Sequence, residues 1–255
     1  MALNTANSTP DDGDTSSHGH DPQSCEACEV RACGMCSSLS NGELDKLRRI
    51  TRTREYKAGD QIFCDEEPLQ NYAAIKQGIV KLSKILPDGR QQTLGLGFPP
   101  DFIGRTYGEE NVCFASAVTD VTVCTFPKEL FNDYLMRTPA LEHKLFQLTL
   151  NELDTARDWM VMLGRMTALE RTATMLLKFS TKRHLGVMDP PPIDGTVRFE
   201  LPLTRSEISD FLGLTIETVS RQFTQLRHLG LIKIDQQRYI DILDYQGLMA
   251  VSGQE

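Results

Sequence analysis

The sequence predicts an α+β protein with an N-terminal β-roll, one long helix and a C-terminal winged helix-turn-helix. Three features support this fold class. Residues 56–127 form short β-branched or alternating segments separated by Gly, Pro and Asp, which is typical of antiparallel strands. Residues 140–163 contain no Gly or Pro, which favours one long helix. Near the C-terminus, two short helical patterns are separated by a single glycine.

The composition is that of a folded chain of one to two domains. Its 255 residues are 40% hydrophobic and 24% charged, which argues against an intrinsically disordered protein. No apolar run reaches the roughly 18 residues that span a membrane, and no secretory signal pattern is present. We therefore expect a cytoplasmic protein without a membrane partner. The net charge of −8 provides no bulk attraction for nucleic acid, so DNA binding must rest on a local motif.

We expect four segments along the chain. Residues 1–24 hold Asp but no Lys or Arg, together with many small polar residues, and this composition predicts a disordered tail. Residues 25–138 combine a cysteine-rich segment with a β-roll sensor domain. Residues 139–165 form the long helix, and residues 166–255 form the winged helix-turn-helix.

The β-roll is predicted from strand patterns that alternate with turn signals. Ser40 and Glu43 form a capping-box pattern, so a short helix precedes the strands. The clearest strand patterns are Asp60–Phe63, Ala73–Ile75, Ile79–Leu82, Phe102–Gly104 and Val118–Phe126, with a turn at Pro87–Gly89. A generic antiparallel sheet fits the same pattern.

The long helix carries an apolar seam. Phe146, Leu153, Ala156, Met160 and Leu163 follow one another in steps compatible with one helix face. Such a seam suits a two-helix contact in a homodimer. A core helix buried within one chain explains the periodicity equally well.

Two short helices joined by a glycine predict a helix-turn-helix. Thr204 and Glu207 form a capping box at the start of the first helix, which ends at Gly213. Thr215 can cap the second helix. Residues 231–243 form two β-rich runs around a polar turn, which predicts a hairpin wing behind the helices.

The second helix carries a group that can read bases. Glu217, Ser220 and Arg221 lie at i, i+3 and i+4 near its N-terminus, where a recognition helix meets DNA. Arg matches the paired acceptors of guanine, Glu accepts from cytosine, and Ser serves either base. Alternatively, Glu217 is a first-turn acid and Arg221 a solvated surface base. Residues 201–238 hold five basic and four acidic residues, so phosphate attraction is modest and dimerisation must add affinity.

Four of the seven cysteines lie between Cys25 and Cys36, so they do not resemble a disulfide framework. In a reducing compartment such a cluster indicates metal binding or redox chemistry. Cys64 and Cys113 are expected to be small buried hydrophobic residues. No nucleophile–base set or phosphate-binding glycine loop is present, so the sequence does not predict an enzyme.

A β-roll, a long helix and a winged helix-turn-helix carrying LTIETVSR at residues 214–221 together resemble the CRP/FNR family of bacterial transcription regulators. In the FNR branch, the E-x-x-S-R pattern implies an inverted repeat of TTGAT-like half-sites, read here by Glu217, Ser220 and Arg221. The cyclic-nucleotide branch has a Gly-Glu-Leu segment, where this chain has Gly104-Arg105-Thr106. The resemblance therefore implies no cyclic nucleotide. It also implies a contact with RNA polymerase, for which the turn at residues 87–90 is a candidate.

The same resemblance implies a [4Fe-4S] cluster as the cofactor of an oxygen sensor that controls anaerobic and microaerobic genes. Its ligands would be Cys25, Cys28, Cys36 and the distant Cys124, with Cys33 as the alternative to Cys36. Four thiolates also suit tetrahedral zinc, so a zinc- or thiol-redox-dependent regulator of this fold is the alternative. A haem-dependent sensor of the same fold is a further alternative.

Overall fold

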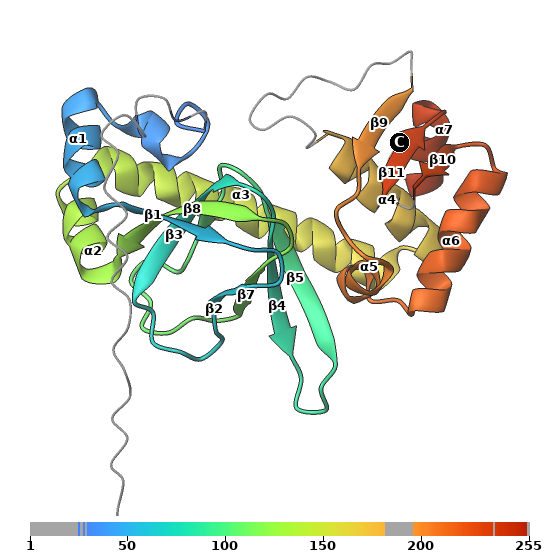
Figure 1. Cartoon of the computed structure of the whole chain (residues 1–255), viewed down its shortest axis with the longest axis horizontal. Coiled ribbons are helices and arrows are strands. Elements are labelled where there is room, and N and C mark those ends of the chain that lie inside the picture. The colour runs from blue at the N-terminus through green and yellow to red at the C-terminus, as the bar shows by residue number, and fades with distance from the viewer. Residues whose placement is uncertain (1–24, 26–27, 29, 182–195, 237, 254–255) are drawn as a thin grey trace, which may run out of the picture.

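The computed structural model describes residues 25, 28, 30–181, 196–236 and 238–253 (Figure 1). The tail predicted at residues 1–24 lies outside this range. So do residues 186–195, where three consecutive prolines predict a loop. A β-roll and its helices are followed by the long helix α3 and by a smaller C-terminal unit of helices around a sheet. The predicted fold class is confirmed.

The β-roll consists of two four-stranded antiparallel sheets, with strand orders β1-β8-β3-β6 and β2-β7-β4-β5. The strands are β1 (Arg52–Tyr56), β2 (Gln61–Phe63), β3 (Asn71–Gln77), β4 (Val80–Ile85), β5 (Gln91–Gly97), β6 (Phe102–Ile103), β7 (Phe114–Ala117) and β8 (Val121–Pro127). Small and β-branched side chains from both sheets fill the space between them, including Ile75, Val80, Ala115 and Val123. Burial on alternate positions explains why these short segments form strands.

Two edge strands, β1 and β5, were not predicted. Most of the β1 side chains are exposed, so the alternation that signals a half-buried strand is missing. Its pairing with β8 places Thr53 opposite Cys124, which brings the edge of the sheet next to a candidate site residue.

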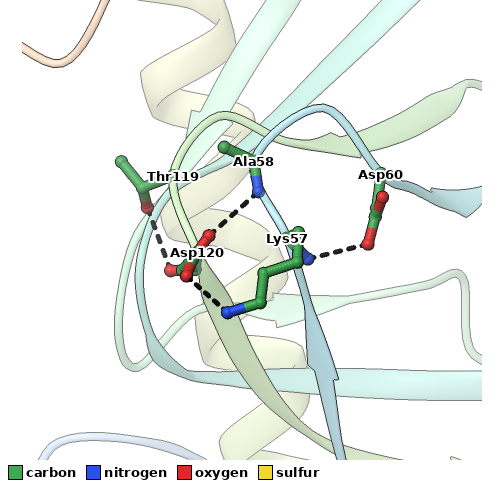
Figure 2. Close-up of polar contacts among 5 residues, drawn as sticks. All are labelled: Lys57, Ala58, Asp60, Thr119 and Asp120. Carbon is green, nitrogen blue, oxygen red and sulfur yellow. Dashed lines mark hydrogen bonds and ion pairs between the residues drawn. The ribbon is translucent and has the colours of Figure 1, made fainter.

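A polar cluster ties the turn after β1 to the turn before β8 (Figure 2). The Asp120 carboxylate accepts hydrogen bonds from Lys57 Nζ at 2.9 Å and from the Ala58 N–H at 3.1 Å. The Asp60 carboxylate accepts from the Lys57 N–H at 2.7 Å. These contacts satisfy backbone groups of the turn and hold the two chain reversals together.

Helices cover one end of the β-roll (Figure 1). They are the 3-10 helix η1 (Met35–Ser38) and the α-helices α1 (Asn41–Ile50) and α2 (Lys128–Met136). The predicted capping box begins α1, where the Ser40 N–H donates to the Glu43 carboxylate at 2.9 Å. Leu44, Phe131 and Leu141 share one buried cluster, so these helices pack against the first turns of α3.

Helix α3 (Pro139–Arg165) has 27 residues and links the β-roll to the C-terminal unit. At about 1.5 Å per residue it is roughly 40 Å long. Leu141 and Leu145 are buried at its start, and Met162 is buried at its end. Between them, most of the helix is exposed within this chain. The prediction of one long helix is confirmed.

The C-terminal unit contains α4 (Ala168–Thr181), β9 (Val197–Glu200), α5 (Arg205–Leu212), α6 (Ile216–His228), β10 (Ile232–Asp235), β11 (Tyr239–Ile242) and α7 (Tyr245–Ser252). The predicted hairpin of β10 and β11 is present, and β9 joins it as a third strand that the sequence did not predict. Gly213 has a left-handed φ of 62° at the turn between α5 and α6, which glycine adopts without strain. No helix within the described residues has the length and apolar character to cross a membrane.

Candidate functional site

Four cysteines from two separate parts of the chain line one cavity of about 50 Å³. Cys25, Cys28 and Cys36 come from the segment before α1, and Cys124 comes from β8. These are the four residues predicted as metal ligands. Cys33 lies outside the cavity lining, as do Cys64 and Cys113.

The cysteine segment is held against the β-roll by two kinds of contact. Met35 is 1% exposed and packs in the buried cluster that it shares with residues of α1, α2 and α3. Gly34 lies so close to a β-roll turn that a Cβ there would be 2.9 Å from the side-chain Cβ of Pro100. Within the segment, the Arg31 N–H donates to the Cys28 carbonyl at 3.1 Å. Packing thus brings Cys36 to the cavity, although Cys36 and Cys124 are 88 residues apart in the sequence.

Burial raises the pKa of the Cys36 thiol to about 12, with smaller contributions from neighbouring Cys124, Cys25 and Cys28. Burial likewise raises the pKa of Cys124 to about 12, against the opposing effect of Lys76. Both thiols are therefore protonated at neutral pH in the metal-free protein. A soft metal centre would displace these protons, so its affinity should rise with pH.

Three cations that line the cavity were not predicted, namely Arg31, Arg48 and Lys76. Arg31 and Lys76 contribute to its lining, and each lowers the pKa of one thiol, Arg31 for Cys36 and Lys76 for Cys124. No local pattern marks Lys76, because it reaches the cavity only through the pairing of β3 with β8. These positive charges favour anionic sulfur ligands at this site.

The four cysteines supply soft sulfur donors, which both iron–sulfur clusters and tetrahedral zinc use. Within the described residues, no three His, Cys, Asp or Glu side chains are placed to hold a metal ion. The four cysteines line a mainly apolar cavity. Four soft sulfur donors around such a space suit a polynuclear centre.

Helix α6 has one buried and one exposed face. Val219, Phe223 and Leu226 are buried in the core of the C-terminal unit, as the pattern predicted. The predicted base-reading residues Glu217, Ser220 and Arg221 are all exposed. Figure 1 shows α6 on the outer side of this unit.

The N-terminus of α6 is organised by local hydrogen bonds. Thr215 caps the helix, accepting from the Thr218 N–H at 3.2 Å. A hydrogen bond from its own backbone N–H lowers the pKa of Glu217. This carboxylate is therefore ionised and can accept hydrogen bonds. Arg221 donates weakly to Thr218 at 3.3 Å. This arrangement presents one anion, one hydroxyl and one guanidinium on a single exposed face.

The predicted seam of α3 is largely exposed. Phe146 is 60%, Leu153 43% and Met160 64% exposed, and Ala156 is exposed as well. Leu163 differs, because it is half-buried against the core of the C-terminal unit. Its packing is therefore explained within one chain, whereas the other seam residues leave an uncovered apolar stripe.

Comparisons with known proteins agree with this architecture. Residues 53–138 match the cyclic nucleotide-binding domain family, and residues 170–251 match the Crp-like helix-turn-helix domain family. The first match covers the β-roll with α2, and the second covers most of the C-terminal unit.

The chain is 42% identical over 227 residues to a probable transcriptional activator of Rhizobium leguminosarum bv. viciae, covering 89% of this chain and 92% of that protein. It is 35% identical to the transcriptional activator protein FnrL of Cereibacter sphaeroides, covering 91% and 92%. The solved structure of FixK2 from Bradyrhizobium japonicum matches with a TM-score of 0.70 at 30% identity, covering 79% of this chain and 97% of that one. The prediction of a regulator that is not an enzyme is confirmed: the chain belongs to the CRP/FNR family of transcription regulators.

Proposed function

We propose that this protein is an oxygen-sensing transcriptional activator that binds DNA as a homodimer while a [4Fe-4S] cluster is intact. The observation that carries the proposal is the single cavity lined by Cys25, Cys28, Cys36 and Cys124. Three of these residues belong to the segment before α1, and the fourth lies on strand β8 of the β-roll. Ligation of all four would join this segment to the β-roll and to the helices beside it.

The bound cluster would supply an oxygen-labile centre. The cysteines would hold it, and Arg31 and Lys76 would offset the negative charge of four thiolates. Because Met35 packs in the cluster that contains the start of α3, ordering of the cysteine segment is linked to the position of that helix. A ligand that favours the dimeric form stabilises DNA binding by its differential affinity for that form.

The proposed dimer forms along the exposed seam of α3, through Phe146, Leu153, Ala156 and Met160. Two copies of α6 would then face successive major grooves, which lie about 34–36 Å apart in related complexes. Glu217, Ser220 and Arg221 would read TTGAT-like half-sites of an inverted repeat. The turn at Asp88 and Arg90, which form an exposed ion pair at 2.8 Å, is the proposed contact with RNA polymerase.

The decisive experiment is anaerobic purification followed by an absorption spectrum and iron and sulfide analysis, then exposure to air. We expect about four irons and four sulfides per subunit. Brown absorbance should bleach in air while affinity for an inverted-repeat DNA falls. Colourless protein with zinc, or with no metal, whose DNA binding is unchanged by air would contradict the oxygen-sensor proposal and favour the zinc- or thiol-dependent alternative.

A further inference from the structure

The guanidinium of Arg171, on α4, donates to three backbone carbonyls. Its Nε lies 2.9 Å from the Met166 oxygen, its Nη1 2.9 Å from the Leu212 oxygen, and its Nη2 2.6 Å from the Leu163 oxygen. Only arginine presents several donors in one rigid planar group, so this geometry suits no other side chain.

The three carbonyls belong to the ends of two different helices. Leu163 lies in the last turn of α3 and Met166 is its C-cap, whereas Leu212 is the last residue of α5. Carbonyls at helix C-termini lack intrahelical partners and carry partial negative charge. One cation therefore joins the end of the long helix to the end of the first helix of the helix-turn-helix.

Strand β5 of the β-roll also contacts α5 near this junction. Gln92 Nε2 donates to the Asp210 carbonyl, in α5, at 3.0 Å. A Cβ built on Gly213 would lie 3.6 Å from Leu163 Cδ2, 3.7 Å from Arg171 Nη1 and 3.8 Å from Gln92 Oε1. The turn before the recognition helix thus sits where α3, α4 and β5 meet.

We propose that Arg171 is a positioning residue that fixes the recognition helix relative to the dimer helix, with Gln92 as a second, weaker contact from the β-roll. The proposal rests on the proposed function as a dimeric DNA-binding regulator. If Arg171 holds the two helix ends together, the two recognition helices of a dimer keep one separation and one relative rotation. If these hydrogen bonds are lost, each DNA-binding unit can rotate independently of the dimer helix.

The test is a DNA panel in which the spacer between TTGAT-like half-sites is changed one base pair at a time. Each added base pair rotates one half-site by roughly 34° and moves it by about 3.4 Å. For the anaerobically purified wild-type chain we expect a sharp affinity optimum at one spacing. For Arg171→Met we expect about tenfold weaker binding at that spacing and a flattened profile across the panel. Arg171→Lys keeps the positive charge but lacks the planar guanidinium, so its affinity and its spacing profile should be intermediate.

The matched control is Arg49→Met, which removes one positive charge from an exposed position on α1 and should leave the profile unchanged. Thermal unfolding and oligomeric state report whether each variant is folded and dimeric. If Arg171→Met does not fold, the proposal is tested with Gln92→Ala. We expect this variant to flatten the profile of affinity against spacing to a smaller extent.

A wild-type spacing profile in the folded variant would overturn the proposal. Equal weakening at every spacing would also overturn it, since that result indicates a role in stability alone. Failure of the wild-type chain to bind any member of the panel would instead refute dimeric DNA binding, on which the proposed role of Arg171 depends.

Discussion

The ring of Trp159, on α3, meets the ring of Phe211, on α5, edge to face, with centroids 4.2 Å apart and planes at 67°. Lys178 Nζ lies 5.8 Å from the centre of the Trp159 ring. Trp159 is the only tryptophan in the chain. Its fluorescence therefore reports directly on the junction between the dimer helix and the DNA-binding unit.

Phe211→Ala should loosen this junction. Phe211 is 4% exposed, so its removal leaves a cavity and should lower the free energy of unfolding by about 3–5 kcal/mol. Urea unfolding followed by Trp159 emission measures the loss, and a red-shifted native spectrum would show the exposed indole. Leu229→Ala, at a position that is 54% exposed, should change stability by only about 0.5 kcal/mol. Equal effects would show that the contact is unimportant.

Serine substitutions distinguish the cysteines that hold the proposed cluster. Cys36→Ser and Cys124→Ser should each remove most bound iron, because each takes away a thiolate that lines the cavity. Cys33→Ser is the matched control and should retain iron, since Cys33 lies outside the lining. Iron and sulfide analysis of anaerobically purified variants gives the answer. Loss of iron in Cys33→Ser with retention in Cys36→Ser would reverse the assignment.

Arg221→Ala should weaken specific DNA binding by about 1–3 kcal/mol and relax the base preference at one position of each half-site. The reason is that an exposed arginine near the start of a recognition helix can bond two acceptors of one guanine. Binding to a set of single-base variants measures this. Arg227→Ala, later on the same helix, should lower affinity for every sequence alike. Unchanged base preference in Arg221→Ala would refute base reading by this side chain.

Leu153→Glu should dissociate the proposed dimer. A charge in the centre of an apolar symmetric seam is introduced twice, once from each copy, at a cost of about 2 kcal/mol each, so the dimer Kd should rise by roughly a thousandfold. Sedimentation equilibrium measures the shift. Thr155→Glu adds the same charge roughly half a turn around the helix and should leave the dimer intact. Dimerisation that is insensitive to Leu153→Glu would place the interface elsewhere.

Asp120→Asn should reduce stability at neutral pH but not in strong acid. The hydrogen bond from Lys57, followed by that from the Ala58 N–H, lowers the pKa of Asp120 in the folded state (Figure 2). The unfolded chain therefore binds the proton more readily, so this contribution is present above the unfolded pKa of about 3.8 and is lost as the pH falls through the folded value. The Tm values of the two proteins should differ at pH 7 and converge near pH 2. A constant difference at all pH values would contradict this linkage.

Local signals in the sequence predicted the helix starts well. Thr204 and Thr215 each cap a helix through a hydrogen bond that spans only three residues, so the pattern contains all the information needed. The edge strand β1 was missed because its exposed side chains do not alternate, and its pairing with β8 depends on residues about 70 positions away. Strand β9 was missed for a related reason, since it pairs with the distant β11.

The sequence alone determined the order of β-roll, long helix and winged helix-turn-helix, the set of candidate cysteines, and the exposed Glu217, Ser220 and Arg221 on α6. The order of elements and the exposed face of α6 depend on periodicity or on hydrogen bonds between near neighbours in the chain. The cysteines were chosen from their clustering at residues 25–36 and, for Cys124, from the family resemblance. Only the tertiary structure decided that Cys36 and Cys124 line one cavity, that Leu163 packs inward, and that Arg171 joins the ends of two helices. These relationships arise from packing between elements far apart in sequence, which no local pattern of residues encodes.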